Sequence, residues 1–170
     1  MYEMKGKYST KNIWISLVMA IIFGITGNIL KSNQKYNHKS EYPMAVDINM
    51  VGKYPVDVSS GAGYFYDDVL EYRVWVHPEQ GGKDLFEGED YFLPFITYEE
   101  ALSYSKKTKG AEEPLVLIRQ KEWISEPKPK LYIHMKETRL TEWKVEWLEG
   151  RRRMKDSIAK FLKNRVIHGN

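Results

Sequence analysis

Residues 12–30 form a run of nineteen uncharged, mostly apolar residues, bounded by Lys11 and Lys31. The hydrocarbon core of a bilayer is about 30 Å thick, and a helix that rises ~1.5 Å per residue needs about 20 apolar residues to cross it. The run therefore predicts a transmembrane anchor over residues 12–31, and we expect the lipid bilayer to be the partner of residues 12–30.

The same run could instead be a cleaved signal peptide or a buried core helix. A signal peptide has an apolar region of about 7–15 residues that ends at a small-x-small cleavage site, which residues 24–30 do not offer. A core helix of a soluble domain usually turns a polar face to water, and this run has no polar face. An anchor or uncleaved signal is therefore the favoured interpretation, with a cleaved signal as the alternative.

The orientation of the anchor depends on the charges beside it. Three lysines precede the run and three follow it: Lys5, Lys7 and Lys11, then Lys31, Lys35 and Lys39. Because cytoplasmic flanks carry an excess of Lys and Arg, this count is nearly a tie. A short N-terminal tail with the bulk of the chain behind the span is typical of a signal-anchor. We therefore expect residues 1–11 to be a cytoplasmic tail and the globular part to lie outside the cytoplasm, on the periplasmic side.

Composition limits what the rest of the chain can be. The formal net charge of +3 is small and spread along the sequence, so no nucleic-acid partner is expected. The absence of cysteine excludes disulfides, thiol nucleophiles and cysteine metal sites. Polar residues without periodicity, followed by interruptions at proline and glycine, predict a tether over residues 32–59. Residues 60–170 are long enough for one globular domain with its own core.

Alternating apolar residues in that domain predict a mainly antiparallel sheet with one face toward water. The expected strands cover residues 71–77, 90–96, 114–124 and 130–148. The last stretch is too long for one strand and should break near Thr138 and Arg139. Pro94 predicts that the second strand lies at a sheet edge or contains a bulge.

Two helices complete the predicted α+β fold. Thr97 and Glu100 form a capping box, and Gly110 offers a left-handed stop, so a well-capped helix between them is expected to pack on the sheet. A C-terminal helix is expected from about Asp156. The aromatic content of 14% favours a thick aromatic core over a binding face.

Few residues are candidates for catalysis. His77 and His134 are the histidines within predicted strands, and Asp67 and Asp68 come just before the first strand. A histidine near a carboxylate can act in acid–base chemistry. No HxH or HxxxH spacing occurs, so no metal site is predicted. The simpler interpretation is that histidines and loop carboxylates coincide by chance in a domain of this size.

Two other segments could bind ligands but have simpler interpretations. Gly61-Ala62-Gly63 lacks the strand-then-helix context of a phosphate-binding loop, so it predicts a turn that needs backbone freedom. The basic run Arg151–Arg153 could contact lipid phosphates, which contribute roughly 1 kcal/mol per basic residue near a bilayer. A solvated turn before the last helix is the simpler interpretation of that run.

Four sequence blocks within residues 60–162 carry a resemblance: GAGYFYDDVLEYRVWVHPEQGG, TYEEALSYS, GAEEPLVLIRQKEWI and RLTEWKVEWLEG. In this order they are similar to a small bacterial protein family of unestablished function, whose members are sometimes labelled GCN5-related acetyltransferases. The resemblance implies an acyltransferase that uses acetyl-CoA. Such enzymes bind the cofactor pyrophosphate with an Arg/Gln-x-x-Gly-x-Gly/Ala turn that opens a helix. Here Arg119 and Gln120 are followed by Lys-Glu-Trp, so this motif is not found and no cofactor-binding residue is assigned.

These observations favour a membrane-anchored binding or envelope-associated module without a cofactor. The alternative is a GCN5-related acyltransferase that uses acetyl-CoA, and a third hypothesis is an enzyme built on His77 and neighbouring carboxylates. The side of the membrane separates the first two hypotheses, because cytosolic acetyl-CoA would require the domain to face the cytoplasm.

Overall fold

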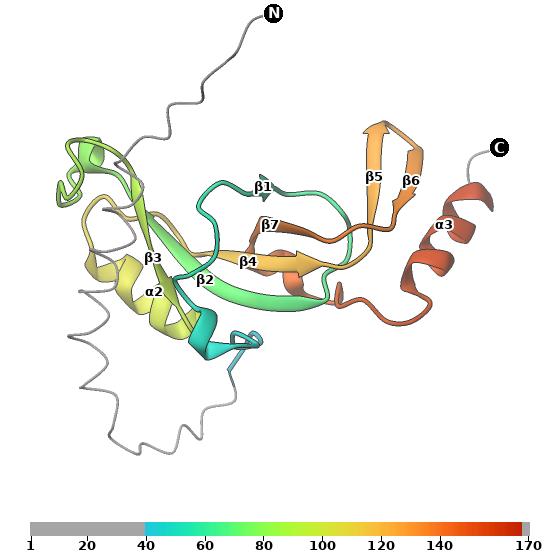
Figure 1. Ribbon diagram of the computed structural model, residues 1–170, viewed down its shortest axis with the longest axis horizontal. Helices are drawn as coiled ribbons and strands as arrows, with labels where there is room; N and C mark the ends of the chain where they lie inside the picture. Colours follow the sequence, from blue (N-terminus) through green and yellow to red (C-terminus); the bar gives the residue numbers. More distant parts are fainter. Residues whose placement is uncertain (1–39, 168–170) are drawn as a thin grey trace, which may run out of the picture. The chain divides into compact units, whose positions relative to one another are not determined.

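The computed structural model of the 170-residue chain describes residues 40–167 (Figure 1). The predicted cytoplasmic tail, the predicted anchor over residues 12–31 and the first part of the predicted tether lie outside the described residues. Within residues 40–167, no helix has the length and apolar character needed to cross a bilayer.

A mixed sheet of five strands, in the order β1-β7-β4-β2-β3, forms the centre of the domain. The strands are β1 (Ser59–Ser60), β2 (Asp68–Val76), β3 (Tyr91–Phe95), β4 (Leu115–Gln120) and β7 (Arg139–Lys144). Neighbouring strands from β7 to β3 pair antiparallel, whereas the short β1 pairs parallel with β7. The predicted α+β fold with a mainly antiparallel sheet is confirmed. Pro94 lies on the edge strand β3, as predicted.

Between β4 and β7 the chain forms a separate hairpin of β5 (Trp123–Lys128) and β6 (Leu131–Met135). Figure 1 shows this hairpin projecting from the sheet beyond the end of β4. The stretch predicted as strand over residues 130–148 is thus divided, and the predicted break before Arg139 is confirmed. Its last part was predicted wrongly, because Val145–Leu148 is a 3-10 helix.

Two α-helices belong to the described residues at 40–167: α2 (Tyr98–Lys107) and α3 (Ser157–Ile167). The Thr97 cap is confirmed, because the Thr97 hydroxyl accepts the backbone N–H of Glu100 at 3.3 Å. Helix α2 packs against β2 and β3 and buries Ala101 completely. Gly110 has the expected left-handed φ of 72°, although α2 already ends three residues earlier.

Helix α3 is attached to the hairpin by aromatic contacts. The ring centroid of Phe161 lies 4.6 Å from that of Tyr64 and 5.2 Å from that of Tyr132 on β6. Edge-to-face and tilted ring pairs at these distances are typical of favourable aromatic packing. The C-terminal helix predicted from about Asp156 is therefore confirmed, with its first residue at Ser157.

The main core lies between the sheet and α2. It contains Tyr72 and Val74 of β2, Val116 and Ile118 of β4, and Trp143 of β7. Trp143 is 1% exposed, and its indole N–H donates to the carbonyl of Ala62 at 3.0 Å. A buried indole usually needs such a partner for its N–H. Trp143 is thus a core residue, as the aromatic content predicts.

The opposite face of β2 is buried as well, although it carries charges. Arg73 is fully buried and donates to Glu71 at 2.8 Å, to Glu142 at 2.7 Å and to the carbonyl of Pro55 at 2.7 Å. Glu71 is also fully buried, and Glu142 is 12% exposed at its side chain. The prediction that this face of the sheet is exposed to water is therefore wrong for β2. The charged side chains on it form a buried ion group, which other residues of the chain cover.

Part of that cover is the segment that contains Gly52 and Pro55. The N–H of Ala45 donates to the carbonyl of Ile96 at 2.9 Å, and the N–H of Gly52 donates to Glu71 at 2.7 Å. Ala45 is 3% exposed. The compact unit consequently begins at Ser40 rather than at residue 60, so that the second part of the stretch predicted as a tether is part of the fold.

Candidate functional site

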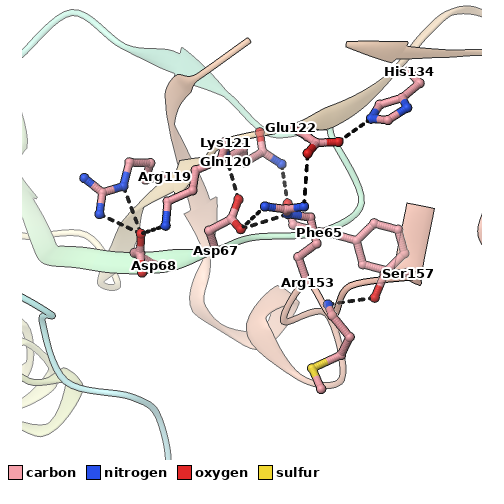
Figure 2. Close-up of polar contacts among 11 residues, drawn as sticks. Phe65, Asp67, Asp68, Arg119, Gln120, Lys121, Glu122, His134, Arg153 and Ser157 are labelled. Carbon is pink, nitrogen blue, oxygen red and sulfur yellow. Dashed lines mark hydrogen bonds and ion pairs between the residues drawn. The ribbon is translucent and has the colours of Figure 1, made fainter. Parts of the chain in front are cut away.

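A network of charged side chains lies where β2 begins and β4 ends (Figure 2). Because these strands are antiparallel and Asp68 is opposite Arg119, the two strand ends meet. The loop before α3 reaches the same place, where the N–H of Arg153 donates to the carbonyl of Tyr66 at 2.7 Å. We call the following residues the polar network: Asp67, Asp68, Arg119, Lys121, Glu122, His134 and Arg153.

Asp67 joins three parts of the chain. One carboxylate oxygen accepts from Nε of Arg153 at 2.8 Å and lies 2.7 Å from its Nη2. The other accepts the backbone N–H of Lys121 at 2.6 Å. The hydrogen bond that Arg153 donates to Asp67 raises the pKa of the Arg153 guanidinium, and the charges of Asp67 and Glu122 add to this effect. Asp67 therefore holds the loop before α3 against the end of β4.

Asp68 forms a second pair beside the first. Its Oδ2 accepts from Nε of Arg119 at 2.9 Å and from Nη2 at 2.6 Å, and Nζ of Lys121 lies 3.5 Å away. Burial alone would raise the pKa of the Asp68 carboxyl, but the hydrogen bonds and charge of Arg119, with those of Lys121, lower it below its ordinary value. Asp68 thus remains charged at neutral pH.

His134 and Glu122 form the third pair. Nε2 of His134 lies 2.7 Å from Oε2 of Glu122, while Oε1 of Glu122 is 3.5 Å from Nη1 of Arg153. The side chain of His134 is 27% exposed and that of Glu122 is 37% exposed. A carboxylate that orients an imidazole is an arrangement suited to proton transfer. This pair is the part of the network with the most evident chemical capability.

Arg139, at the start of β7, contacts uncharged side chains. Its Nε donates to Oε1 of Gln120 at 2.7 Å, its guanidinium carbon lies 3.7 Å from the centroid of the Trp123 ring, and its Nη2 is buried without a hydrogen-bond partner. Burial lowers the pKa of Arg139. Within residues 40–167, no carboxylate lies within ion-pair distance of this guanidinium. Because Nη2 is closed off from solvent, this cation is a packing element rather than an open anion site.

His77 lies at the other end of β2, away from Asp67 and Asp68. Nine residues of strand, at about 3.3 Å each, separate the two ends. Its Nδ1 is 2.9 Å from Asp90, and its Nε2 is 3.0 Å from Glu112, although the latter contact lacks good hydrogen-bond geometry. Burial lowers the pKa of His77, but the hydrogen bond and charge of Asp90, with the charge of Glu112, outweigh it and raise this pKa overall.

Of the four predicted candidates, the structure brings Asp67, Asp68 and His134 to one end of the sheet and leaves His77 at the other. Sequence reasoning missed Glu122 as the partner of His134, and it missed Arg153 as the link between Asp67 and Glu122. Arg153 stood out only as part of a basic run. In the described part of the chain, no three His, Asp or Glu side chains are arranged to hold a metal ion.

A shallow hollow of about 530 Å³ opens beside the network. Its lining includes the apolar residues Met44, Val46 and Ile48, and Asp67, Asp68 and Arg152 contribute polar groups. Because Asp67 is already paired with a cation, the hollow presents mainly apolar surface with an arginine at its rim.

Comparison of the chain with protein-family models, with curated proteins and with solved structures found no match. The class that the fold defines is an α+β domain with a mixed five-stranded sheet, a hairpin and two helices. Its polar network contains three acidic and three basic side chains besides His134, so the charges offset one another.

The Asp68–Arg119 pair should make stability depend on pH. Because the folded-state pKa of Asp68 is below the unfolded value of about 3.9, its contribution is present above pH ~4 and is lost as pH falls through the folded-state pKa. We expect Asp68→Asn to lower the free energy of unfolding by about 1.5 kcal/mol at pH 7 and by much less in acid. Urea titrations from pH 7 to pH 2.5 measure this difference. The exposed Asp57→Asn serves as the control, and an equal loss for Asp68→Asn at all pH values contradicts the expectation.

Proposed function

We propose that this protein is a single-pass, membrane-anchored binding module whose folded unit lies outside the cytoplasm. The observation that carries the proposal is the uncharged run over residues 12–30, which ends only nine residues before the folded unit starts at Ser40. A run of this length is sufficient for a helix across the bilayer. The short connection would keep the domain at the membrane surface.

The pairing within the polar network supports a binding role more than a reaction centre. Asp67 is neutralised by Arg153, and Asp68 is neutralised by Arg119. A general base or nucleophile must be free to exchange a proton or attack a substrate. These pairs instead join β2, β4 and the loop before α3. They thereby fix the positions of Asp67 and Asp68, which line the neighbouring hollow.

An acetyl-CoA-dependent acyltransferase is the competing proposal, from the resemblance described above. In acetyltransferases of that class, backbone N–H groups at a helix N-terminus bind the cofactor pyrophosphate. The stretch from Arg119 to Trp123 is here the end of β4 and the start of β5, with no helix beginning between them. Isothermal titration of the full chain in nanodiscs with acetyl-CoA tests this proposal. Saturable binding would favour the acyltransferase, whereas we expect none.

The anchor itself is tested by extraction of membranes at alkaline pH. We expect the full chain to stay in the membrane pellet and a Val18→Glu/Ile22→Glu variant to move to the supernatant, because each charge at the centre of a span costs about 2.5–3.5 kcal/mol. A matched variant with the same charges outside the run, Gln34→Glu/Asn37→Glu, should remain in the pellet. Release of the unmodified chain would contradict the proposal.

A further inference from the structure

We infer that the exposed side chains of Met44, Val46 and Ile48 dock the folded unit onto the surface of a lipid bilayer. This inference rests on the proposed function and adds to it a second, peripheral membrane contact. We call these three residues the docking face.

The docking face consists of large apolar side chains at alternate positions. Met44 is 51% exposed, Val46 is 59% exposed and Ile48 is 51% exposed, whereas Ala45 between them is 3% exposed. Single exposed apolar residues are ordinary on protein surfaces. Several that line the same hollow are more typical of a surface that contacts another apolar phase.

The backbone holds the docking face in place. The N–H of Ala45 donates to the carbonyl of Ile96, and the N–H of Val46 donates to the carbonyl of Val69, both at 2.9 Å. Asp47 then caps a short 3-10 helix by accepting the N–H of Asn49 at 3.0 Å. Little conformational entropy would therefore be lost when these side chains enter a membrane interface.

Charges at the rim suit the headgroup region of a bilayer. Arg152 lines the hollow beside the docking face, and Arg151 next to it is also exposed. Basic residues close to a bilayer are attracted to anionic headgroups. The carboxylates of Asp67 and Asp68 also line the hollow, but Arg153 and Arg119 neutralise them. Asp47, which lies between Val46 and Ile48 in the chain and is exposed, is an acidic group next to the docking face.

The length of chain before the folded unit favours a bilayer as the occupant. Nine residues, 31–39, separate the uncharged run from Ser40, and fully extended they reach at most about 30 Å. They include three lysines and no acidic residue. The docking face begins four residues after Ser40. A connection of this length would therefore keep the docking face within reach of the membrane in which residues 12–30 are anchored.

The test uses the full chain in nanodiscs and takes advantage of its lack of cysteine. Val46→Cys carries an environment-sensitive fluorophore, and Leu131→Cys, at a 48% exposed apolar position on β6, is the control. Doxyl groups in the lipid chains quench a fluorophore that enters the interface. We expect roughly twofold stronger quenching at position 46, since interfacial segments sit about 5–10 Å into the headgroup boundary.

Two further variants show what produces the contact. Met44→Ser/Ile48→Ser in the Val46→Cys background should reduce quenching to the level of position 131, whereas Ile133→Ser should not. Arg151→Gln/Arg152→Gln should remove the increase that anionic lipid produces over zwitterionic lipid. Because all of these side chains are exposed, the variants should fold.

The outcomes separate this inference from the anchor proposal. Equal quenching at positions 46 and 131 in discs that contain the chain overturns docking but leaves the anchor intact. Failure of the chain to enter discs overturns the anchor and this inference together. Shielding at position 46 only when several chains share one disc identifies a second copy as the occupant, and this also overturns lipid docking.

Discussion

Replacement of Arg73 by methionine should lower the free energy of unfolding by about 3–5 kcal/mol at pH 7, because one cation of a buried ion group is removed. Glu71 and Arg73 have no exposed surface, and Glu142 retains little. Without the guanidinium, two carboxylates would face each other under residues 52–55. Chemical denaturation of the wild-type and variant chains measures the effect.

Two controls separate loss of charge from loss of packing. Burial already raises the pKa of Glu71 above its ordinary value, and this carboxyl should take up a proton readily once Arg73 is gone. A group with a raised folded-state pKa stabilises the fold at low pH and loses that contribution as pH rises, so the defect should shrink toward pH 4. The triple variant Glu71→Gln/Arg73→Met/Glu142→Gln should recover much of the loss. A pH-independent loss below 1 kcal/mol would contradict the buried-charge explanation.

The second large effect is expected at Gly63, in the turn between β1 and β2. Its φ is 93°, and a Cβ atom would lie 2.1 Å from Nε2 of Gln120 and 2.7 Å from Nη2 of Arg139. Arg139 donates to Oε1 of Gln120, and Gln120 in turn donates to the carbonyl of Phe65, so both side chains are fixed. We expect Gly63→Ala to cost about 3 kcal/mol, from left-handed backbone strain together with overpacking.

Gly88 provides a matched control for this substitution. Its φ of 89° is nearly the same, but nothing lies within 4 Å of a Cβ atom there. Gly88→Ala should therefore show the backbone strain alone, about 1–2 kcal/mol. If thermal denaturation gives equal losses for the two variants, the contact of Gly63 with Gln120 and Arg139 has no energetic role.

The elements of the fold were predictable where the signal is local. The cap at Thr97, the edge position of Pro94 and the break before Arg139 all follow from neighbouring residues, and the structure contains them. The alternation of apolar and charged residues continues through Trp147 and therefore predicts a strand there. The segment is instead a 3-10 helix, which also buries apolar residues on one side, so the alternation does not distinguish the two structures. Local patterns could not reveal the role of residues 40–58, because their partners are distant strands.

The candidate site was only partly predictable for the same reason. Asp67 and Arg153 are 86 residues apart, and only the tertiary fold brings them within 2.8 Å. Likewise, the carboxylates beside His77 are Asp90 and Glu112, which no spacing rule selects. The turn at Gly61–Gly63 was predictable from its two glycines, and the structure confirms it, because all three residues have positive φ.

The proposed function connects a chemical pattern at one end of the chain with a folded unit at the other. Residues 12–30 supply the apolar length, and residues from Ser40 onward supply a domain in which Asp67, Asp68 and Arg73 are each paired with an opposite charge. A catalytic interpretation would need His134 to act on a ligand beside Glu122. That role would be visible as saturable ligand binding sensitive to His134→Gln, which the binding-module proposal does not require.

The most direct test of the proposal is the accessibility of the C-terminal end to protease in bacterial spheroplasts, whose plasma membrane is intact. A protease site and an epitope tag are placed after Asn170, and the protease is added outside the plasma membrane. The proposal predicts that the tag is lost while a cytoplasmic control protein stays intact, and that the rest of the chain remains in the membrane pellet. A tag that is protected until the membrane is broken would place the domain in the cytoplasm and contradict the proposal.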